Sequence, residues 1–269
     1  MGGADYRHDL SGLLDDYVAT NCDEGLVAYL VANSRLPGPR GNLELADAFA
    51  VAVRDRATRD AERLWQLCLR LAEVRIEQAP VGDPKEFLTF CGARGIAAVA
   101  SCSAAFLAQG LARLQELARD PRWRVREGVA MGIQDLLSRR GGQTLRALEG
   151  WIVGSDWLAM RAVAAAVAEP RLLRDGTMAS AALQLHQEIL MRVLASDERT
   201  SAEFKTLRQG LGYSLSVVIC ALPREGFAYL HDLGRSEDAD VQWIVKENLK
   251  KNRLAKASPK EVDFIRSAL

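Results

Sequence analysis

Residues that serve most enzyme active sites are scarce in this sequence. The 269 residues include only three histidines, and aromatic residues make up 6% of the chain. The histidines are far apart, and none has a cysteine or carboxylate at metal-ligand spacing, so we expect surface or helix-packing histidines and no metal site. No phosphate-binding glycine loop, no G-x-S-x-G elbow and no serine paired with a histidine is apparent. The sequence therefore predicts no catalytic residue and no cofactor.

Cysteine pairing and membrane segments are also missing. The five cysteines are odd in number and none forms a C-x-x-C pair, which argues against a disulfide framework and a zinc site. Each falls in an apolar stretch, so we predict buried thiols in a reducing, cytoplasmic setting. The N-terminal segment MGGADYRHDL is polar, and no apolar run reaches membrane-spanning length. We therefore expect no membrane partner.

Net charge is lacking as well, because 35 basic side chains balance 35 acidic ones. Proteins that hold nucleic acid through bulk electrostatics are usually basic, so neutrality argues mildly against a strong phosphate binder. The charge is uneven, however. Residues 1–60 carry ten acids and six bases, whereas residues 239–269 carry four acids and seven bases. The C-terminal end is therefore the basic part of the chain.

What the sequence does contain is helix-forming composition. Hydrophobic residues make up 49% of the chain, with alanine and leucine predominating, and no β-rich run bounded by turn residues is present. This composition predicts an all-α fold. Two segments rich in proline and glycine, 34–42 and 79–84, are predicted to be loops, and both are too short for interdomain linkers. We therefore predict one domain over residues 1–269. Helices are expected near 9–20, 24–33, 43–56, 59–78, 84–101, 103–119, 122–138, 142–153, 156–168, 178–195, 201–220, 224–234, 239–251 and 259–268.

A repeated pattern is clearest in the segment DPRWRVREGVAMGIQDLL, residues 120–137. Asp120 is placed to cap the helix that follows, with Pro121 in its first turn. Val125 is predicted to face the core. Arg126, one turn into the helix, is expected to reach an acidic or carbonyl group of a neighbouring repeat.

Weaker copies of this pattern occur along the chain, including 155–169, where Ser155 takes the place of the capping aspartate, and 236–249. The equivalent positions are 32 to 47 residues apart, which is typical of stacked pairs of helices. The pattern resembles the HEAT repeat, and the resemblance implies a right-handed α-solenoid of antiparallel helix pairs with a concave binding surface. The positions equivalent to the consensus arginine are Arg94, Arg126, Arg161, Arg208 and Gln242.

Small residues follow this position and predict close helix contacts. Gly128, Gly210 and Gly212 lie mid-helix, where glycine costs about 1 kcal/mol relative to alanine, so a packing reason is expected. The segment GARG, 92–95, is interpreted in the same way. The last copy carries polar residues instead, including Asn248, which predicts a C-terminal capping repeat with a polar outer face.

The tryptophans supply candidate binding residues. Trp123 and Trp157 are both predicted in the first turn of a repeat helix, and Trp123, between two arginines, is expected to be partly exposed. The other three, Trp65, Trp151 and Trp243, are predicted to be core residues.

The segment WIVGSDWLAMRAVA, residues 151–164, is similar to part of the HEAT-like DNA alkylpurine glycosylases. The resemblance implies that Trp151 and Trp157 form an aromatic pair beside a DNA-facing Arg161. That family carries its catalytic aspartate in a W-W-D-x-x-D motif ahead of this segment. No such motif is present, and the carboxylates of the preceding helix, Glu127 and Asp135, do not follow a tryptophan at the required spacing. We therefore expect no base excision.

Two functional hypotheses remain open. The first is a non-catalytic scaffold that presents its concave surface to a macromolecular partner. The second is a DNA-binding protein related to the alkylpurine glycosylases, in which basic residues should line one groove with Trp123 or Trp157. Arginines at the consensus position often tie repeats together instead. The candidate residues for binding protein or nucleic acid are Trp123, Arg124, Trp157, Arg161, Lys246 and Lys250.

Overall fold

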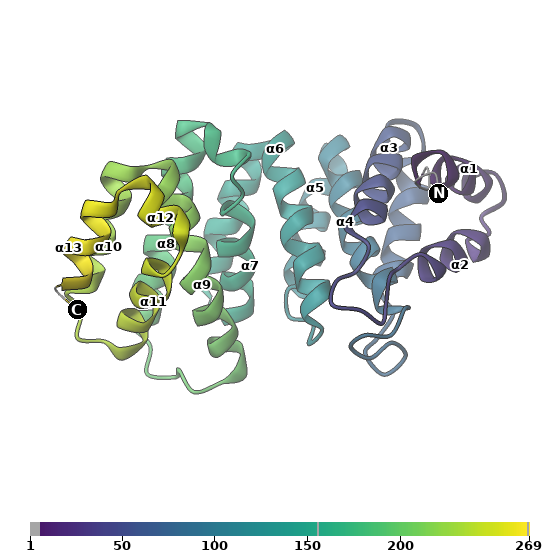
Figure 1. Cartoon of the computed structure of the whole chain (residues 1–269). Helices are drawn as coiled ribbons and strands as arrows, with labels where there is room; N and C mark the ends of the chain where they lie inside the picture. The colour runs from purple at the N-terminus through teal and green to yellow at the C-terminus, as the bar shows by residue number, and fades with distance from the viewer. Residues whose placement is uncertain (1–5, 155, 268) are drawn as a thin grey trace. The chain divides into compact units, whose positions relative to one another are not determined.

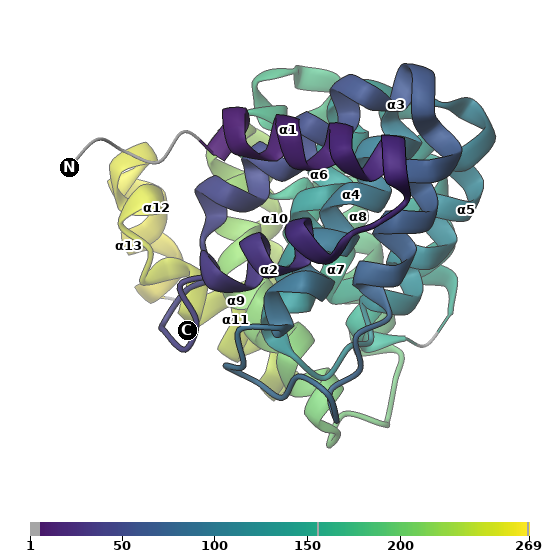
Figure 2. The same ribbon diagram turned by 90° about the vertical axis from the view of Figure 1, so that its right-hand side faces the viewer.

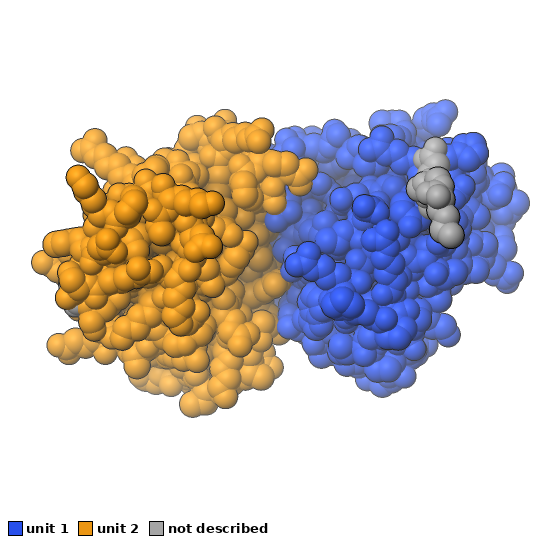
Figure 3. All heavy atoms as spheres, viewed as in Figure 1, with its two compact units in different colours: residues 1–144 blue, residues 145–269 orange. Residues whose placement is uncertain are grey.

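The computed structural model describes residues 6–154, 156–267 and 269, and these are helical throughout with connecting loops and no strand (Figure 1). The all-α prediction is confirmed. The chain divides into two units, residues 1–144 and 145–269 (Figure 3), with the boundary inside a long helix. The predicted single domain stays a prediction. Ser155, the expected cap of one repeat copy, lies outside the described residues.

Unit 1 contains five helices and most of a sixth. Two of them are kinked, α3 at Asp60 and α6 at Arg140, where the backbone leaves helical dihedral angles. The kink at Arg140 falls between two helices that the sequence predicts separately, 122–138 and 142–153. The kink at Asp60 instead lies at the second residue of the helix predicted over 59–78. The helices of this unit are α1 (Tyr6–Thr20), α2 (Glu24–Ala32), α3 (Leu43–Ala72), α4 (Glu86–Cys102), α5 (Ala104–Leu117) and α6 (Trp123–Val153).

Helix α4 is the centre of unit 1. It packs against α2, α3 and α5, and its side chains are buried almost along its whole length. Figure 2 shows α1 and α2 side by side, with α1 packed on α3. Gly92 confirms the predicted close contact, because a Cβ built there would lie 2.5 Å from the backbone nitrogen of Ala72. Gly128 behaves similarly, with a built Cβ 3.0 Å from the carbonyl oxygen of Phe90.

Both predicted loops of unit 1 are present, the first one residue longer than expected and the second more than twice as long. The first spans 33–42 and the second 73–85, so the helix predicted over 59–78 ends early, at Ala72. Asn42 closes the first loop: its side chain accepts a hydrogen bond from Leu45 N at 3.2 Å and caps α3. The second loop is held by Arg122, which directly precedes α6 and donates hydrogen bonds to loop carbonyl oxygens.

Unit 2 is built around α9, which packs against α7, α8, α10, α11 and α12. Aspartate or serine side chains accept backbone N–H groups at the starts of α7, α8, α9 and α11, which explains where these helices begin. The short α12 was not predicted. The elements of this unit are α7 (Trp157–Val167), the 3-10 turn η1 (Leu172–Arg174), α8 (Gly176–Leu194), α9 (Ala202–Ala221), α10 (Pro223–Gly234), α11 (Ala239–Leu249), α12 (Asn252–Ala257) and α13 (Pro259–Ser267).

The predicted polar capping face on α11 is wrong at Asn248, although Lys246 is exposed. Helices α12 and α13 follow α11 and pack against it. Asn248 is fully buried, and its amide donates to the carbonyl oxygens of Leu211 and Ile244 at 2.9 and 2.8 Å. Its Oδ1 accepts the N–H of Ser216 at 2.8 Å. The asparagine therefore ties α11 to α9, an internal role that its polarity alone could not reveal.

The five equivalent repeat positions all lie on helices, namely α4, α6, α7, α9 and α11. Two of the arginines join helices as expected. Arg94 pairs with Asp47 of α3 at 2.8 Å and Asp135 of α6 at 2.9 Å. Arg208 of α9 pairs with Asp240 of α11.

The start of α6 differs from the prediction in detail. Pro121 precedes the helix, which begins at Trp123. Arg126 donates hydrogen bonds to the carbonyl oxygens of Asp120 and Pro121, at 2.7 and 3.0 Å. These carbonyls belong to the turn before its own helix and not to a neighbouring repeat. Val125 is fully buried, as predicted.

Candidate functional site

The most exposed tryptophan is Trp123, the first residue of α6. Its side chain is 43% exposed, in agreement with the prediction of a partly exposed ring. The guanidinium carbon of Arg124 lies 4.4 Å from the ring centroid, which is the geometry of a cation–π contact. The ring is therefore supported on one side by the protein.

Arg124 is itself held by buried groups. Its Nη1 lies 3.3 Å from Oε2 of Glu86, and its Nη2 donates to the carbonyl oxygen of Gly38 at 2.5 Å. Glu86 is fully buried and also accepts the N–H of Gly82 at 2.8 Å. Arg124 was named as a binding residue from the sequence, but it is only 7% exposed. The structure places it beneath the tryptophan, where it holds the ring.

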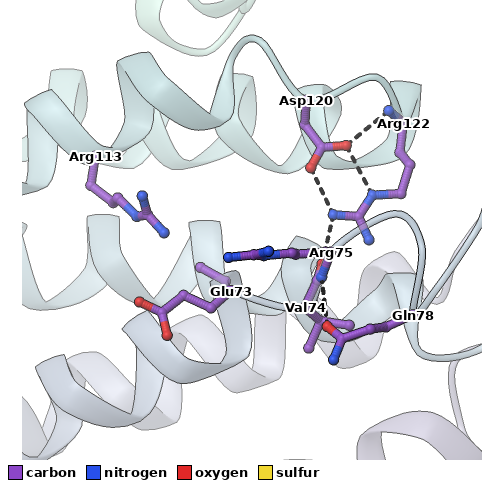
Figure 4. Close-up of a pocket in the computed structure, with 8 residues that line it drawn as sticks. Glu73, Val74, Arg75, Gln78, Arg113, Asp120 and Arg122 are labelled. Atoms are coloured by element: carbon purple, nitrogen blue, oxygen red, sulfur yellow. Dashed lines mark hydrogen bonds and ion pairs between the residues drawn. The ribbon is translucent and has the colours of Figure 1, made fainter.

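A polar hollow of about 620 Å³ lies in the same unit (Figure 4). It is formed by the end of α3, the loop 73–85, α5 and the segment before α6. Sequence reasoning did not find it, because its walls come from segments about forty residues apart. The residues that line it are Ala72, Glu73, Val74, Arg75, Gln78, Arg113, Asp120 and Arg122.

Arg122 fixes one wall of this hollow. It is 1% exposed, and its guanidinium makes a two-point contact with Asp120, Nε to Oδ1 at 2.9 Å and Nη2 to Oδ2 at 2.7 Å. It also donates to the carbonyl oxygens of Ala79 at 3.2 Å and Val74 at 2.8 Å. Arg122 thereby clamps the loop 73–85 to the start of α6.

Two further arginines reach the hollow with unused donors. Within the described residues, the guanidinium of Arg75 has no hydrogen-bond or ion-pair partner, and its side chain is exposed. Arg113 pairs with Glu116 at 2.6 Å, yet its buried Nε donates no hydrogen bond. In Figure 4 both guanidinium groups lie on the side where the carboxylate of Glu73 also lies. The hollow therefore offers free N–H donors from two arginines and, besides the paired Asp120, the carboxylate of Glu73.

The candidate residues in unit 2 are divided between core and surface. Trp157 is 9% exposed and packs edge-on against Phe204 of α9, with centroids 5.3 Å apart. Arg161 is half-buried on α7. Lys246 is exposed on α11, and Lys250, which directly follows the helix, is exposed and pairs with Glu247. Burial leaves Trp157 without the open ring face that base stacking uses.

The remaining tryptophans mostly follow the prediction. Trp65 and Trp151 are buried, at 6% and 5% exposure. Trp243 is only half-buried, and the guanidinium of Arg208 lies 4.6 Å from its ring centroid.

An exposed aromatic that the sequence analysis missed is Tyr213 on α9. Its side chain is 52% exposed. The guanidinium carbon of Arg253 lies 4.4 Å from the ring centroid, and Lys251 Nζ lies 5.8 Å from it. Arg253 also donates to the tyrosine hydroxyl at 2.6 Å. We call Tyr213, Lys251 and Arg253 the tyrosine platform.

A serine and a histidine are paired, contrary to the sequence analysis. His186 Nε2 lies 2.9 Å from Ser214 Oγ, and Nδ1 lies 2.8 Å from the carbonyl oxygen of Ala182. Because a carbonyl can only accept, Nδ1 carries the proton, and Nε2 of the neutral ring accepts from the serine. Burial lowers the pKa of His186 to about 4. Both side chains are buried, so the pair joins α8 to α9 and no substrate reaches it.

The cysteines are all unpaired, and three depart from the prediction of buried thiols, since Cys102 and Cys220 are only half-buried and Cys22 is exposed. Cys68 and Cys91 are buried, and burial raises the pKa of both thiols. No group of three or more histidine, cysteine or acidic side chains within the described residues is placed to hold a metal ion. Over the same residues, no helix is long and apolar enough to cross a membrane.

Comparison with known proteins identifies no family. No family model matches the chain, and no curated protein matches it. Similar solved structures include three engineered proteins from the Northeast Structural Genomics Consortium. The first is 18% identical over 97% of both chains with a TM-score of 0.37. The second is 19% identical over 97% of this chain and 66% of the other, with a TM-score of 0.35. The third is 15% identical over 87% of this chain and 98% of the other, with a TM-score of 0.30.

Proposed function

We propose that this chain is a non-catalytic HEAT-type α-solenoid scaffold that binds a protein partner in the cytoplasm. The repeated arginine positions support the solenoid, since Arg94 and Arg208 each tie one repeat helix to the next. Such stacks offer long surfaces on which proteins bind without chemistry. Unpaired thiols are consistent with a reducing compartment.

Trp123 is the observation that carries this proposal. Tryptophan is enriched among the few interface residues that supply most of the binding energy. Trp123 is 43% exposed, and its ring rests on Arg124, which is fixed by the buried Glu86. A ring held in place before binding loses little conformational freedom when a partner covers it. We therefore assign Trp123 as the anchor of the partner interface.

Partner identification with a matched control tests the proposal. Tagged wild-type protein, Trp123→Ala and Tyr213→Ala are used to recover partners, and each recovered protein is then purified and titrated by calorimetry. Loss of a hot-spot tryptophan typically costs about 2 kcal/mol or more, so Trp123→Ala should weaken binding by about 30-fold or more. Tyr213→Ala should bind as wild type does. Equal affinity of Trp123→Ala and wild type for every purified partner would contradict the assignment.

The tyrosine platform favours DNA binding as a second candidate function. Single-stranded nucleic acid is commonly held by aromatic rings on which bases stack and by cations that contact the phosphates. Tyr213 has an exposed ring beside Lys251 and Arg253. The exposed Lys246 lies on the adjacent α11, and the exposed Lys250 directly follows that helix. The four basic residues belong to the basic C-terminal part of the chain, residues 239–269.

DNA titration at two salt concentrations tests this second candidate. Neutralising several phosphates makes affinity fall steeply with salt. Salt-sensitive binding that weakens in Tyr213→Ala but not in Trp123→Ala would favour DNA over a protein partner. Release of 7-methylguanine from methylated DNA, abolished by Trp157→Ala or Arg161→Ala, would instead show that the chain is an active glycosylase. Absence of DNA binding would remove this candidate.

A further inference from the structure

We infer that the arginine-lined hollow of unit 1 is a binding site for an oxyanion, a carboxylate or phosphate group carried by a small ligand. The hollow has a volume of about 620 Å³, within the range of pockets that hold small organic molecules. Its lining is mainly polar, with Arg75 and Arg113 reaching into it (Figure 4). This site is separate from the proposed partner anchor, and its test does not depend on the partner.

Unused hydrogen-bond donors point to the chemistry of the ligand. The guanidinium of Arg75 has no partner within the described residues, and the buried Nε of Arg113 donates no hydrogen bond. A buried donor without an acceptor is costly, and an oxyanion supplies acceptors in the geometry that a guanidinium fork prefers. The Nε of Arg113 stays unused although Glu116 already pairs with its Nη1. An oxyanion in the hollow would supply acceptors to both arginines.

The backbone around Arg75 is fixed before any ligand arrives. The carbonyl oxygen of Val74 accepts from Arg122 Nη2 at 2.8 Å and from Thr89 Oγ1 at 3.0 Å. The N–H of Arg75 donates to Gln78 Oε1 at 3.1 Å. The backbone that carries Arg75 is therefore held before binding, which lowers the entropic cost.

Glu73 provides a second, independent test, in which a substitution should raise the affinity for an anion. Its exposed carboxylate lies on the same side of the hollow as both guanidinium groups (Figure 4). The other lining carboxylate, Asp120, is already paired with Arg122. Glu73 therefore opposes a bound anion, and its neutralisation should tighten binding while leaving the fold intact.

The experiment is a titration of the full chain with inorganic phosphate and, separately, with acetate, at constant ionic strength. Nuclear magnetic resonance of arginine Nε–H groups reports binding, and wild type is compared with Arg75→Gln, Glu73→Gln and the control Arg139→Gln. Arg139 is exposed on α6 and does not line the hollow. We expect saturable shifts at Arg75 and Arg113, with affinity lowered about tenfold by Arg75→Gln, raised by Glu73→Gln and unchanged in the control.

The two probes separate the possible sources of the oxyanion. Tighter binding of phosphate assigns the site to phosphorylated ligands, and tighter binding of acetate assigns it to carboxylates. Unsaturable shifts with both probes, or saturable shifts that Arg75→Gln leaves unchanged, would overturn the inference. Circular dichroism of Arg75→Gln verifies that the variant is folded, which is expected because the side chain is exposed.

Discussion

Both units bury neutral polar side chains, but within the described residues they differ in whether they also bury charged ones. Among the described residues, every fully or nearly buried charged side chain lies in unit 1, whereas unit 2 buries neutral groups. Charged groups in a low-dielectric interior depend on their partners, and removal of one partner leaves an uncompensated charge. A buried neutral polar group lowers stability when its hydrogen-bond partner is removed or when the group itself becomes protonated. The buried charged residues are Glu86, Arg94, Arg122 and Arg124, and the buried neutral ones of unit 2 are His186, Ser214, Ser216 and Asn248.

The same difference distinguishes two arginine–tryptophan contacts. In unit 1, Arg124 is buried and the ring of Trp123 is 43% exposed. In unit 2, the side chain of Arg208 is 30% exposed and the ring of Trp243 is half-buried. In unit 1 the ring therefore lies on the solvent side of a buried arginine. The half-exposed arginine covers a tryptophan that packs on Gly212, whose built Cβ would lie 3.1 Å from the ring.

The largest effect is expected from Arg124→Met. This change leaves the carboxylate of Glu86 buried with no cation, and breaking a buried ion pair in this way costs about 3–5 kcal/mol. Urea denaturation followed by circular dichroism measures the loss. The double variant Arg124→Met with Glu86→Leu should recover most of it, since neither charge then remains. If the single variant is as stable as wild type, the buried pair of Arg124 and Glu86 does not stabilise unit 1.

The next effect is acid destabilisation of unit 2 through His186. Burial lowers the pKa of its ring from the ordinary 6.5 to about 4, so the unfolded state binds a proton more readily than the folded state. The buried neutral His186 therefore contributes fully to the free energy of unfolding above pH 6.5. This contribution is lost as pH falls from 6.5 to 4, on the order of 3 kcal/mol in total.

Denaturation midpoints of wild type and His186→Gln between pH 7 and pH 4 measure this dependence. Glutamine does not titrate, so the variant should lack the loss over this interval while both proteins share the carboxylate effects at lower pH. Parallel pH profiles for the two proteins would show that His186 is not the group responsible.

Both predictions rest on buried pairs that could not be found from the sequence, whereas more local features could. Helix positions were largely predictable, including the break at Arg140, because apolar spacing and composition are local properties, and the break at Asp60 falls two residues after the predicted gap at 57–58. The exposure of Trp123 was also predicted, from its flanking arginines. The hollow, the pairing of His186 with Ser214 and the clamp made by Arg122 depend on contacts between residues 28 to 48 positions apart.

Asn248→Ala should have a smaller effect than the first two changes. It leaves the carbonyl oxygen of Leu211 and the N–H of Ser216 buried without the asparagine, which costs about 1–3 kcal/mol. Thermal unfolding measures it, with Asn252→Ala at the exposed start of α12 as the control. A cost equal to that of the control would show that α9 and α11 do not depend on this side chain.

The smallest effect is expected from Arg208→Met. Its ion pair with Asp240 is partly exposed on both sides, so water and salt screen it and the expected loss is below about 1 kcal/mol. Urea denaturation beside Arg124→Met measures both on one scale. A loss at Arg208 as large as that at Arg124 would remove the distinction between the two contacts.

The central claim is that Trp123 binds a partner whereas Trp243 only packs, and one paired measurement tests it. Trp123→Ala and Trp243→Ala are each assayed for stability by urea denaturation and for affinity by calorimetry with a purified partner. The account predicts that Trp123→Ala loses about 30-fold or more in affinity with little change in stability. It predicts that Trp243→Ala loses stability and keeps its affinity. Retained affinity in Trp123→Ala, or equal loss of affinity in both variants, would contradict the account.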